Sequence, residues 1–92
     1  MIERMSDVMV KDGCMRPIMP MNGHHYTLFE MQQLVGGNIE LVDLGKKYLV
    51  LDEEGKLKGK IPNRIATGWL QQEGIHDFAV GTALLIDKKR IR

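Results

Sequence analysis

The single cysteine, Cys14, and the histidines His24, His25 and His76 are the soft metal-ligand types in the sequence. A structural zinc site takes its ligands in close pairs, with spacings such as Cys-x2–4-Cys and His-x3–5-His. Only one cysteine is present here, and the side chains of the adjacent His24 and His25 point in different directions. We therefore predict no metal site and expect a polar loop with Cys14 as a buried or half-buried thiol.

Acid–base and nucleophilic chemistry also have little support. Asp43 and the segment Glu54-Gly55-Lys56 supply the residue types of a metal-dependent nuclease, in which two carboxylates hold the metal and a lysine stabilises charge on the phosphate. Gly55 indicates a turn, which would leave Glu54 and Lys56 apart in water. Ser6, the only serine, has no nucleophile-elbow motif around it. We therefore expect no catalytic residue, no cofactor and no enzymatic activity.

Basic residues in the second half of the chain are the candidates for binding an anion. Lys56, Lys58 and Lys60 alternate, so on a strand they would lie on one face at intervals of about 6.6–6.8 Å. Asn63 begins a helix after Pro62, and the N-terminus of a helix favours an anion. The candidate ligand-binding residues are Lys56, Lys58, Asn63 and Arg64, which could extend into one basic patch with the tail residues Lys88, Lys89, Arg90 and Arg92.

The competing interpretation of these basic residues is a solvated strand face followed by a solubilising tail. Nucleic-acid surfaces usually add aromatic side chains for stacking, and the chain has only one Trp, two Tyr and two Phe. The shortage of aromatic residues favours the solvated face.

All seven methionines lie at or before Met31. Methionines make adaptable contact surfaces, and small domains with thin cores often depend on oligomerisation. Filling of an irregular core or a mobile terminus is the alternative. We expect an interaction surface formed by Met15, Ile18, Met19 and Met21, which would contact a second copy or another protein.

Length and composition bound the fold. The 92 residues suffice for one domain, and 43% hydrophobic with 27% charged residues is typical of globular chains. The net charge of +1 excludes strong global attraction to nucleic acid or acidic membranes. No apolar run approaches the ~18 residues of a membrane span, and the first residues lack a signal-peptide core. Together with the lone cysteine, these features lead us to expect a cytoplasmic protein.

The elements that must position these residues follow from local signals. Thr27 and Glu30 form a capping-box pair and Gly36 a helix stop, which predicts a helix over about residues 28–35. A second short helix follows Asn63 and ends at Gly74. Strands are predicted over 7–10, 14–19 at a sheet edge, 38–44, 48–51, 77–80 and 82–86. An extended segment is predicted at 57–61, and residues 84–86 are expected to be the most buried.

These elements predict a single small α+β domain with a mostly antiparallel sheet of about five strands and two short helices. We divide it into a Met-rich irregular part with edge strands (1–26), a regular α+β part (27–87) and a solvated, frayed basic tail (88–92).

Between Thr27 and Ile86 the chain resembles a family of small bacterial domains of unknown function encoded by phages, plasmids and conjugative elements. The residues that carry the resemblance are Leu34-Val35-Gly36-Gly37-Asn38-Ile39-Glu40, Asp52-Glu53-Glu54-Gly55-Lys56-Leu57, Pro62-Asn63-Arg64-Ile65-Ala66-Thr67 and Val80-Gly81-Thr82-Ala83-Leu84-Leu85. The resemblance implies a mobile-element setting and brings no catalytic residues.

Taken together, the sequence favours a non-enzymatic accessory protein of a mobile genetic element that acts by protein–protein contact or self-association. A small-molecule or nucleotide binder, such as a sponge directed against host signalling, is the first alternative. It would use Lys56, Lys58, Asn63 or Arg64 at a subunit cleft. A weak nucleic-acid-binding accessory protein that uses the same lysines is the second.

Overall fold

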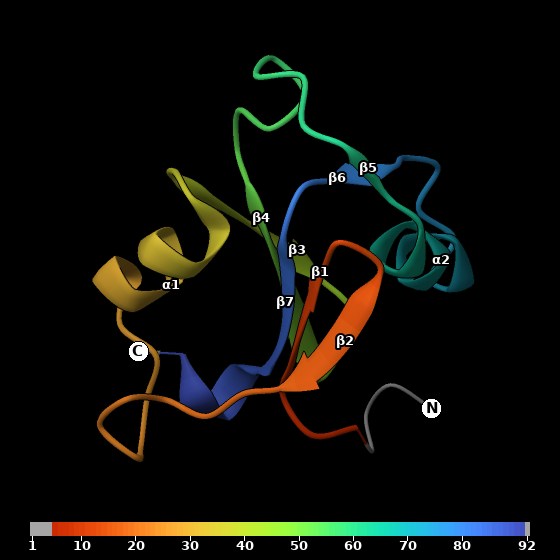
Figure 1. Ribbon diagram of the computed structural model, residues 1–92. Helices are drawn as coiled ribbons and strands as arrows, with labels where there is room; N and C mark the ends of the chain where they lie inside the picture. Colours follow the sequence, from red (N-terminus) through yellow and green to blue (C-terminus); the bar gives the residue numbers. More distant parts are fainter. Residues whose placement is uncertain (1–4, 92) are drawn as a thin grey trace.

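Five antiparallel strands form the central sheet of the computed structural model, which describes residues 5–91 (Figure 1). The strand order is β2-β1-β7-β4-β3, so β2 and β3 are the two edges. A second sheet pairs the two-residue strands β5 and β6. The predicted α+β class with two helices and a five-stranded antiparallel sheet is confirmed. The strands are β1 (Val8–Lys11), β2 (Cys14–Pro17), β3 (Ile39–Asp43), β4 (Lys47–Asp52), β5 (Pro62–Asn63), β6 (Ala79–Val80) and β7 (Ala83–Asp87).

The helices α1 (Leu28–Val35) and α2 (Arg64–Gln72) lie on opposite faces of the sheet, as Figure 1 shows. Ala66, Trp69 and Leu70 of α2 pack with one set of sheet residues, and Met31 and Val35 of α1 pack with the other. The central strand β7 is therefore covered on both sides. Its residues Leu84, Leu85 and Ile86 are fully buried, which confirms the prediction that they form the most buried strand.

Local signals account for the first hairpin. Asp12 and Gly13 connect β1 to β2, and both have positive φ, at 53° and 75°. Such turns match the twist of the flanking strands, and Asp-Gly is a preferred pair for them. Lys11 therefore pairs with Cys14, and β2 is the edge strand that the sequence predicts.

Helix α1 begins and ends where the sequence predicts. The Thr27 hydroxyl accepts the Glu30 N–H at 3.2 Å, and Gly36 ends the helix with φ 81°. The reciprocal half of the predicted capping box is wrong, because the Glu30 carboxylate accepts the N–H of Met21 at 3.0 Å. That bond attaches the segment before α1 to its first turn.

Two other predictions are wrong. Residues 53–59 form consecutive turns, so the lysines expected on a strand at 57–61 lie in a loop. The tail is also ordered up to Ile91, since residues Lys88–Arg90 form a 3-10 helix and Tyr26 bridges Ile91. The Tyr26 N–H donates to the Arg90 carbonyl at 2.6 Å, which holds the tail against the segment before α1. Residue 92 lies outside the described range.

Gly68 lies in the middle of α2, where a Cβ would meet no atom within 4 Å. We predict that Gly68→Ala raises the free energy of unfolding by about 0.5–1 kcal/mol, because glycine is a poor helix former. Gly37→Ala is the matched comparison, since its Cβ would lie 2.6 Å from Lys58 Nζ and 2.8 Å from Asp52 Oδ2. Urea unfolding of both variants should give opposite signs; stabilisation by Gly37→Ala would contradict the packing described.

Candidate functional site

Segment 53–60, called here the lysine turn, lies around a buried carboxylate. The Asp52 side chain is only 1% exposed, and its Oδ2 lies 2.9 Å from Lys58 Nζ and 2.6 Å from Lys60 Nζ. Its Oδ1 accepts the Glu54 N–H at 2.9 Å. Burial alone would raise the pKa of Asp52, but the hydrogen bonds from the two lysines and from Glu54 outweigh it and lower the pKa to about 2.

The same two lysines also satisfy the end of α1. Lys60 donates to the Val35 carbonyl at 2.9 Å, and Lys58 lies 3.4 Å from the Gly36 carbonyl. The last carbonyls of a helix have no partner within it, and cations are favourable there. Helix α1 carries no basic residue in its own last turn, so the lysine turn supplies the charge. Lys58 and Lys60 therefore stabilise the fold through Asp52 and α1.

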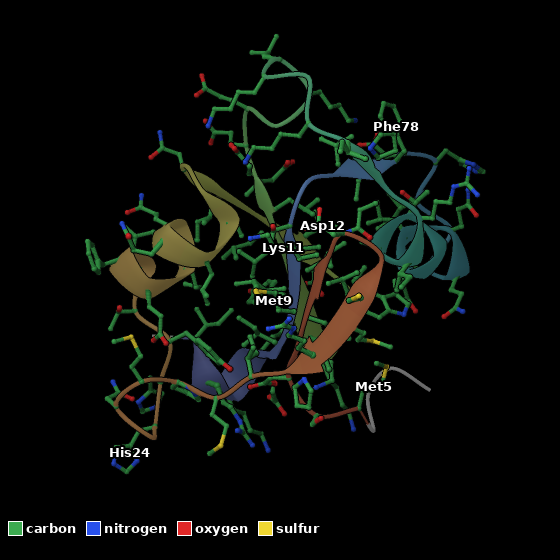
Figure 2. All side chains as sticks on the ribbon, viewed as in Figure 1. Met5, Met9, Lys11, Asp12, His24 and Phe78 are labelled. Atoms are coloured by element: carbon green, nitrogen blue, oxygen red, sulfur yellow. The ribbon has the colours of Figure 1, made fainter. Side chains whose placement is uncertain are left out.

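Lys56, another predicted ligand-binding residue, is also engaged within the protein. Its ammonium group forms an ion pair with Asp77 at 2.5 Å and lies 4.2 Å from the centroid of the Phe78 ring. The lysine lowers the pKa of the Asp77 carboxyl, helped by the Phe78 N–H. Figure 2 shows Phe78 beside the lysine turn.

Asn63 is buried and its side chain is fully used. Its Oδ1 accepts the Ala66 N–H at 3.0 Å, which confirms it as the N-cap of α2. Its amide nitrogen donates to the carbonyls of Val10 at 3.2 Å and Gly81 at 2.9 Å. Among the four predicted ligand-binding residues, only Arg64 is exposed without an acidic partner in the part of the chain that the structure describes.

The basic residues in the second half of the chain do not form one patch, because the sheet separates them. The lysine turn follows the end of β4, whereas residues 88–90 follow β7 beside the start of β4, where Lys47 pairs with Asp87 (Figure 1). Lys88 pairs with Asp43 at 2.7 Å, and Arg90 lies 3.6 Å from Asp7. The two basic clusters therefore face opposite ends of the molecule.

A groove lies at the same end of the molecule as the β1–β2 turn. It has a volume of about 750 Å³ and is bounded by segments 11–13, 59–65 and 81–82. Lys11 and Arg64 contribute charge to it, and Ile61, which is 75% exposed, contributes apolar surface. Lys11 was not among the binding residues predicted from the sequence, although the Asp12-Gly13 pair indicates that this end of β1 lies at a hairpin tip.

The Met-rich segment supplies an exposed apolar surface together with the first turn of α1. Met19, Met21, Leu28 and Phe29 are each more than half exposed, at 71%, 88%, 56% and 69%. The hydrogen bond from Met21 N to the Glu30 carboxylate places the two segments together. We call these four residues the methionine surface. Leu28 and Phe29 were not predicted as interaction residues, because their pattern in the sequence indicates only the start of a helix.

The other two predicted interaction residues lie elsewhere. Met15 is opposite Val10 in the β1–β2 hairpin, and Val10 packs in the core on the α2 side. Ile18 is partly buried against the core on the α1 side. Met15 therefore belongs to the edge of the sheet, and Ile18 belongs to the periphery of the core.

The catalytic arrangements considered from the sequence are not assembled. Asp43 and Glu54 lie at opposite ends of the β3–β4 hairpin, since Asp43 pairs with Tyr48 and Ile39 pairs with Asp52. Cys14 is exposed, which corrects the expectation of a buried thiol, because it follows the hairpin turn on an edge strand. His24 lies far from that turn (Figure 2). Within residues 5–91, no three His, Cys, Asp or Glu side chains are grouped as metal ligands.

A buried polar cluster joins the beginnings and ends of several elements. Asp7 and Lys47 have side chains only 2% and 3% exposed, and their charged atoms lie 3.8 Å apart. Asp7 also accepts the Asp87 N–H at 3.0 Å. Burial, and then the Asp7 and Glu30 carboxylates, raise the pKa of Tyr26 above its ordinary value. We call Asp7, Tyr26, Lys47 and Arg90 the Asp7 cluster.

The fold and its surfaces define a small α+β domain with a helix on each face of an antiparallel sheet. The chain belongs to the family described as domain of unknown function DUF3846, whose sequence profile matches residues 7–90. Comparison with curated proteins and with solved structures gives no match. No helix within residues 5–91 is long and apolar enough to cross a membrane.

Proposed function

We propose that this protein is a non-enzymatic accessory protein that acts by protein–protein contact, and that a second copy is the first partner to test. The observation that carries the proposal is the methionine surface, in which four large apolar side chains from adjoining segments are each more than half exposed. Contiguous exposed apolar residues mark interaction sites more often than isolated ones do.

The character of these residues supports contact with a protein. Methionine and phenylalanine are enriched at the cores of protein interfaces, and the methionine side chain adapts to irregular partners. Met19 and Met21 flank Pro20, which is buried, so the backbone between them is anchored. The surface is therefore presented on a fixed base.

The remaining parts of the proposal have separate support. The absence of enzymatic activity is supported by the separation of Asp43 from Glu54 and of His24 from the first hairpin turn. The mobile-element setting and the cytoplasmic location rest on the sequence alone. The nucleic-acid alternative loses support because Lys56 and Lys58 are paired with Asp77 and Asp52.

The experiment is sedimentation equilibrium of the full chain and of the double variant Met21→Glu/Phe29→Glu. We expect the wild type to self-associate and the variant to need at least about tenfold more protein to do so, because each charge would have to be desolvated in the interface. Both residues are exposed in the monomer, so urea unfolding of the monomeric variant should change by less than about 0.5 kcal/mol.

Leu57→Glu is the matched control, since Leu57 is 87% exposed but lies in the lysine turn. It should leave the association constant unchanged. A wild type that stays monomeric at about millimolar concentration would contradict self-association. If the wild type and the double variant then recovered the same host proteins in pull-downs, a role of the methionine surface in protein contact would be contradicted.

A further inference from the structure

The groove beside the β1–β2 turn has the dimensions of a small-molecule site. Its volume of about 750 Å³ lies within the range of about 300–1,000 Å³ found for ligand pockets. It is built from segments that are distant in sequence, 11–13, 59–65 and 81–82, and shares no residue with the methionine surface. Figure 2 shows Lys11 and Asp12 at the hairpin turn that forms one side.

The charge of the groove favours an anion. Its ionisable residues are Lys11, Lys60 and Arg64 on the basic side and Asp12 on the acidic side. The Lys60 ammonium group is already paired with the Asp52 carboxylate at 2.6 Å. Lys11 and Arg64 are exposed, and neither has an acidic partner among the described residues. Two cations from different elements thus face one groove with a single carboxylate to offset them.

The walls favour an organic ligand over a simple ion. Ile61 is 75% exposed, and Pro62 and the partly buried Ile65 continue the apolar surface. Gly13 and Gly59 lie on the rim, and a Cβ at either position would meet no atom within 4 Å. The rim therefore leaves open space in which a ligand can approach the backbone closely.

We propose that this groove binds a small organic phosphate of nucleoside monophosphate size. Lys11 and Arg64 hold the phosphate, because charge-assisted hydrogen bonds are the strong ones available to it. Ile61 and Ile65 cover the apolar face of the rest of the ligand. This binding activity is additional to the protein contact proposed above and uses a separate surface.

The test is a two-dimensional amide NMR titration of the full chain with each common nucleoside 5′-monophosphate. The expected result is a saturable shift of the amides of Gly13, Ile65 and Gly81, with at least one monophosphate binding at submillimolar Kd. Lys11→Ala and Arg64→Ala should each weaken binding at least about tenfold, since each removes a charge-assisted hydrogen bond to the phosphate. Both side chains are exposed, so the variants should fold.

Lys46→Ala and Lys89→Ala are the matched controls, because both lysines are exposed and lie outside the groove. They should leave Kd unchanged. Adenosine alone and inorganic phosphate alone should each bind at least about tenfold more weakly than the monophosphate. Equal affinity for inorganic phosphate would show an adventitious anion only and would overturn the proposal.

Absence of shifts with every monophosphate at about 5 mM would overturn it as well. So would shifts that map outside segments 11–13, 59–65 and 81–82, or binding of an RNA oligonucleotide without a response to any monophosphate. The proposed protein contact is tested separately by Met21→Glu/Phe29→Glu, which does not alter the groove. A failure of monophosphate binding would therefore not contradict the proposed protein contact.

Discussion

Replacing Lys47 with methionine is expected to lower the free energy of unfolding by about 3–5 kcal/mol. The Asp7 carboxylate is 2% exposed, and Lys47, 3% exposed, is the buried cation beside it at 3.8 Å. Methionine would fill much of the lysine volume but would leave a buried carboxylate whose one remaining cationic partner among residues 5–91 is the half-exposed Arg90 at 3.6 Å. Breaking a buried pair on one side is costly because an uncompensated charge stays in a medium of low dielectric constant.

The measurement is urea unfolding followed by the fluorescence of Trp69, the only tryptophan, which is 7% exposed. Small domains are stable by only about 5–15 kcal/mol, so the midpoint should move far towards zero denaturant. Lys46→Met is the matched control at the exposed neighbouring position and should change stability by less than about 0.5 kcal/mol.

A double variant separates charge from packing. Asp7→Asn/Lys47→Met removes both charges and keeps an oxygen to accept the Asp87 N–H. It should be more stable than Lys47→Met alone, since apolar or neutral replacement of a whole buried pair is often tolerated. If Lys47→Met were no more destabilising than Lys46→Met, the account of the Asp7 cluster as a buried ion pair would be wrong.

Elements governed by neighbouring residues could be predicted from the sequence. Thr27 and Gly36 bound α1, and Asn63 caps α2, because capping depends on hydrogen bonds within a few residues. The continuous apolar run at 84–86 predicted a strand covered on both faces. Strand β7 lies between β1 and β4, with one helix on each face of the sheet. Hydrophobic pattern and caps therefore determine most of this architecture.

The sequence indicates a turn at Gly55, but the continuation of the lysine turn beyond it could not be predicted, because alternation of Lys56, Lys58 and Lys60 is compatible with both a strand and a loop. What decides between them is the buried Asp52 carboxylate and the end of α1, and Lys60 bonds to Val35, which is distant in sequence. The order of the tail depends likewise on the bridge from Tyr26 to Ile91. Long-range electrostatic partners leave no periodic trace in the sequence.

The candidate site was predicted only in part for the same reason. Arg64 was identified from its place after a helix cap, whereas Lys11 joins it in the groove only because the β1–β2 turn folds beside segment 59–65. Asn63 illustrates the opposite error. Its residue type suits a ligand contact, but the backbone carbonyls of Val10 and Gly81 already occupy its amide.

Because the pKa of Asp52 is lowered, we predict a second large effect, which is a decrease in the free energy of unfolding in acid. The folded pKa of about 2 lies below the ordinary value of 3.8, so the folded state holds this proton less tightly than the unfolded state does. The carboxylate therefore contributes its full stabilisation above about pH 4–5, and the contribution is lost as pH falls through about 2. Its size is about 2 kcal/mol, because each pKa unit corresponds to about 1.4 kcal/mol.

Urea unfolding between about pH 2 and pH 7 of the wild type and Asp52→Asn tests this. The variant should be about 2 kcal/mol less stable at neutral pH, and the two stability curves should converge near pH 2. Asp43→Asn is the matched control. Lys88 also lowers the pKa of Asp43, but that pair is exposed at the surface and should matter little once salt is added.

The burial of Asp52 explains why its contribution to stability should persist in salt, whereas the contribution of Asp43 should decrease. Its carboxylate is 1% exposed beneath the two lysines, so mobile ions have little access to it. Parallel pH profiles of the wild type and Asp52→Asn would contradict this account. If they converge as expected, Lys58, which the sequence analysis proposed as an anion-binding residue, already binds an anion, and that anion is the carboxylate of Asp52.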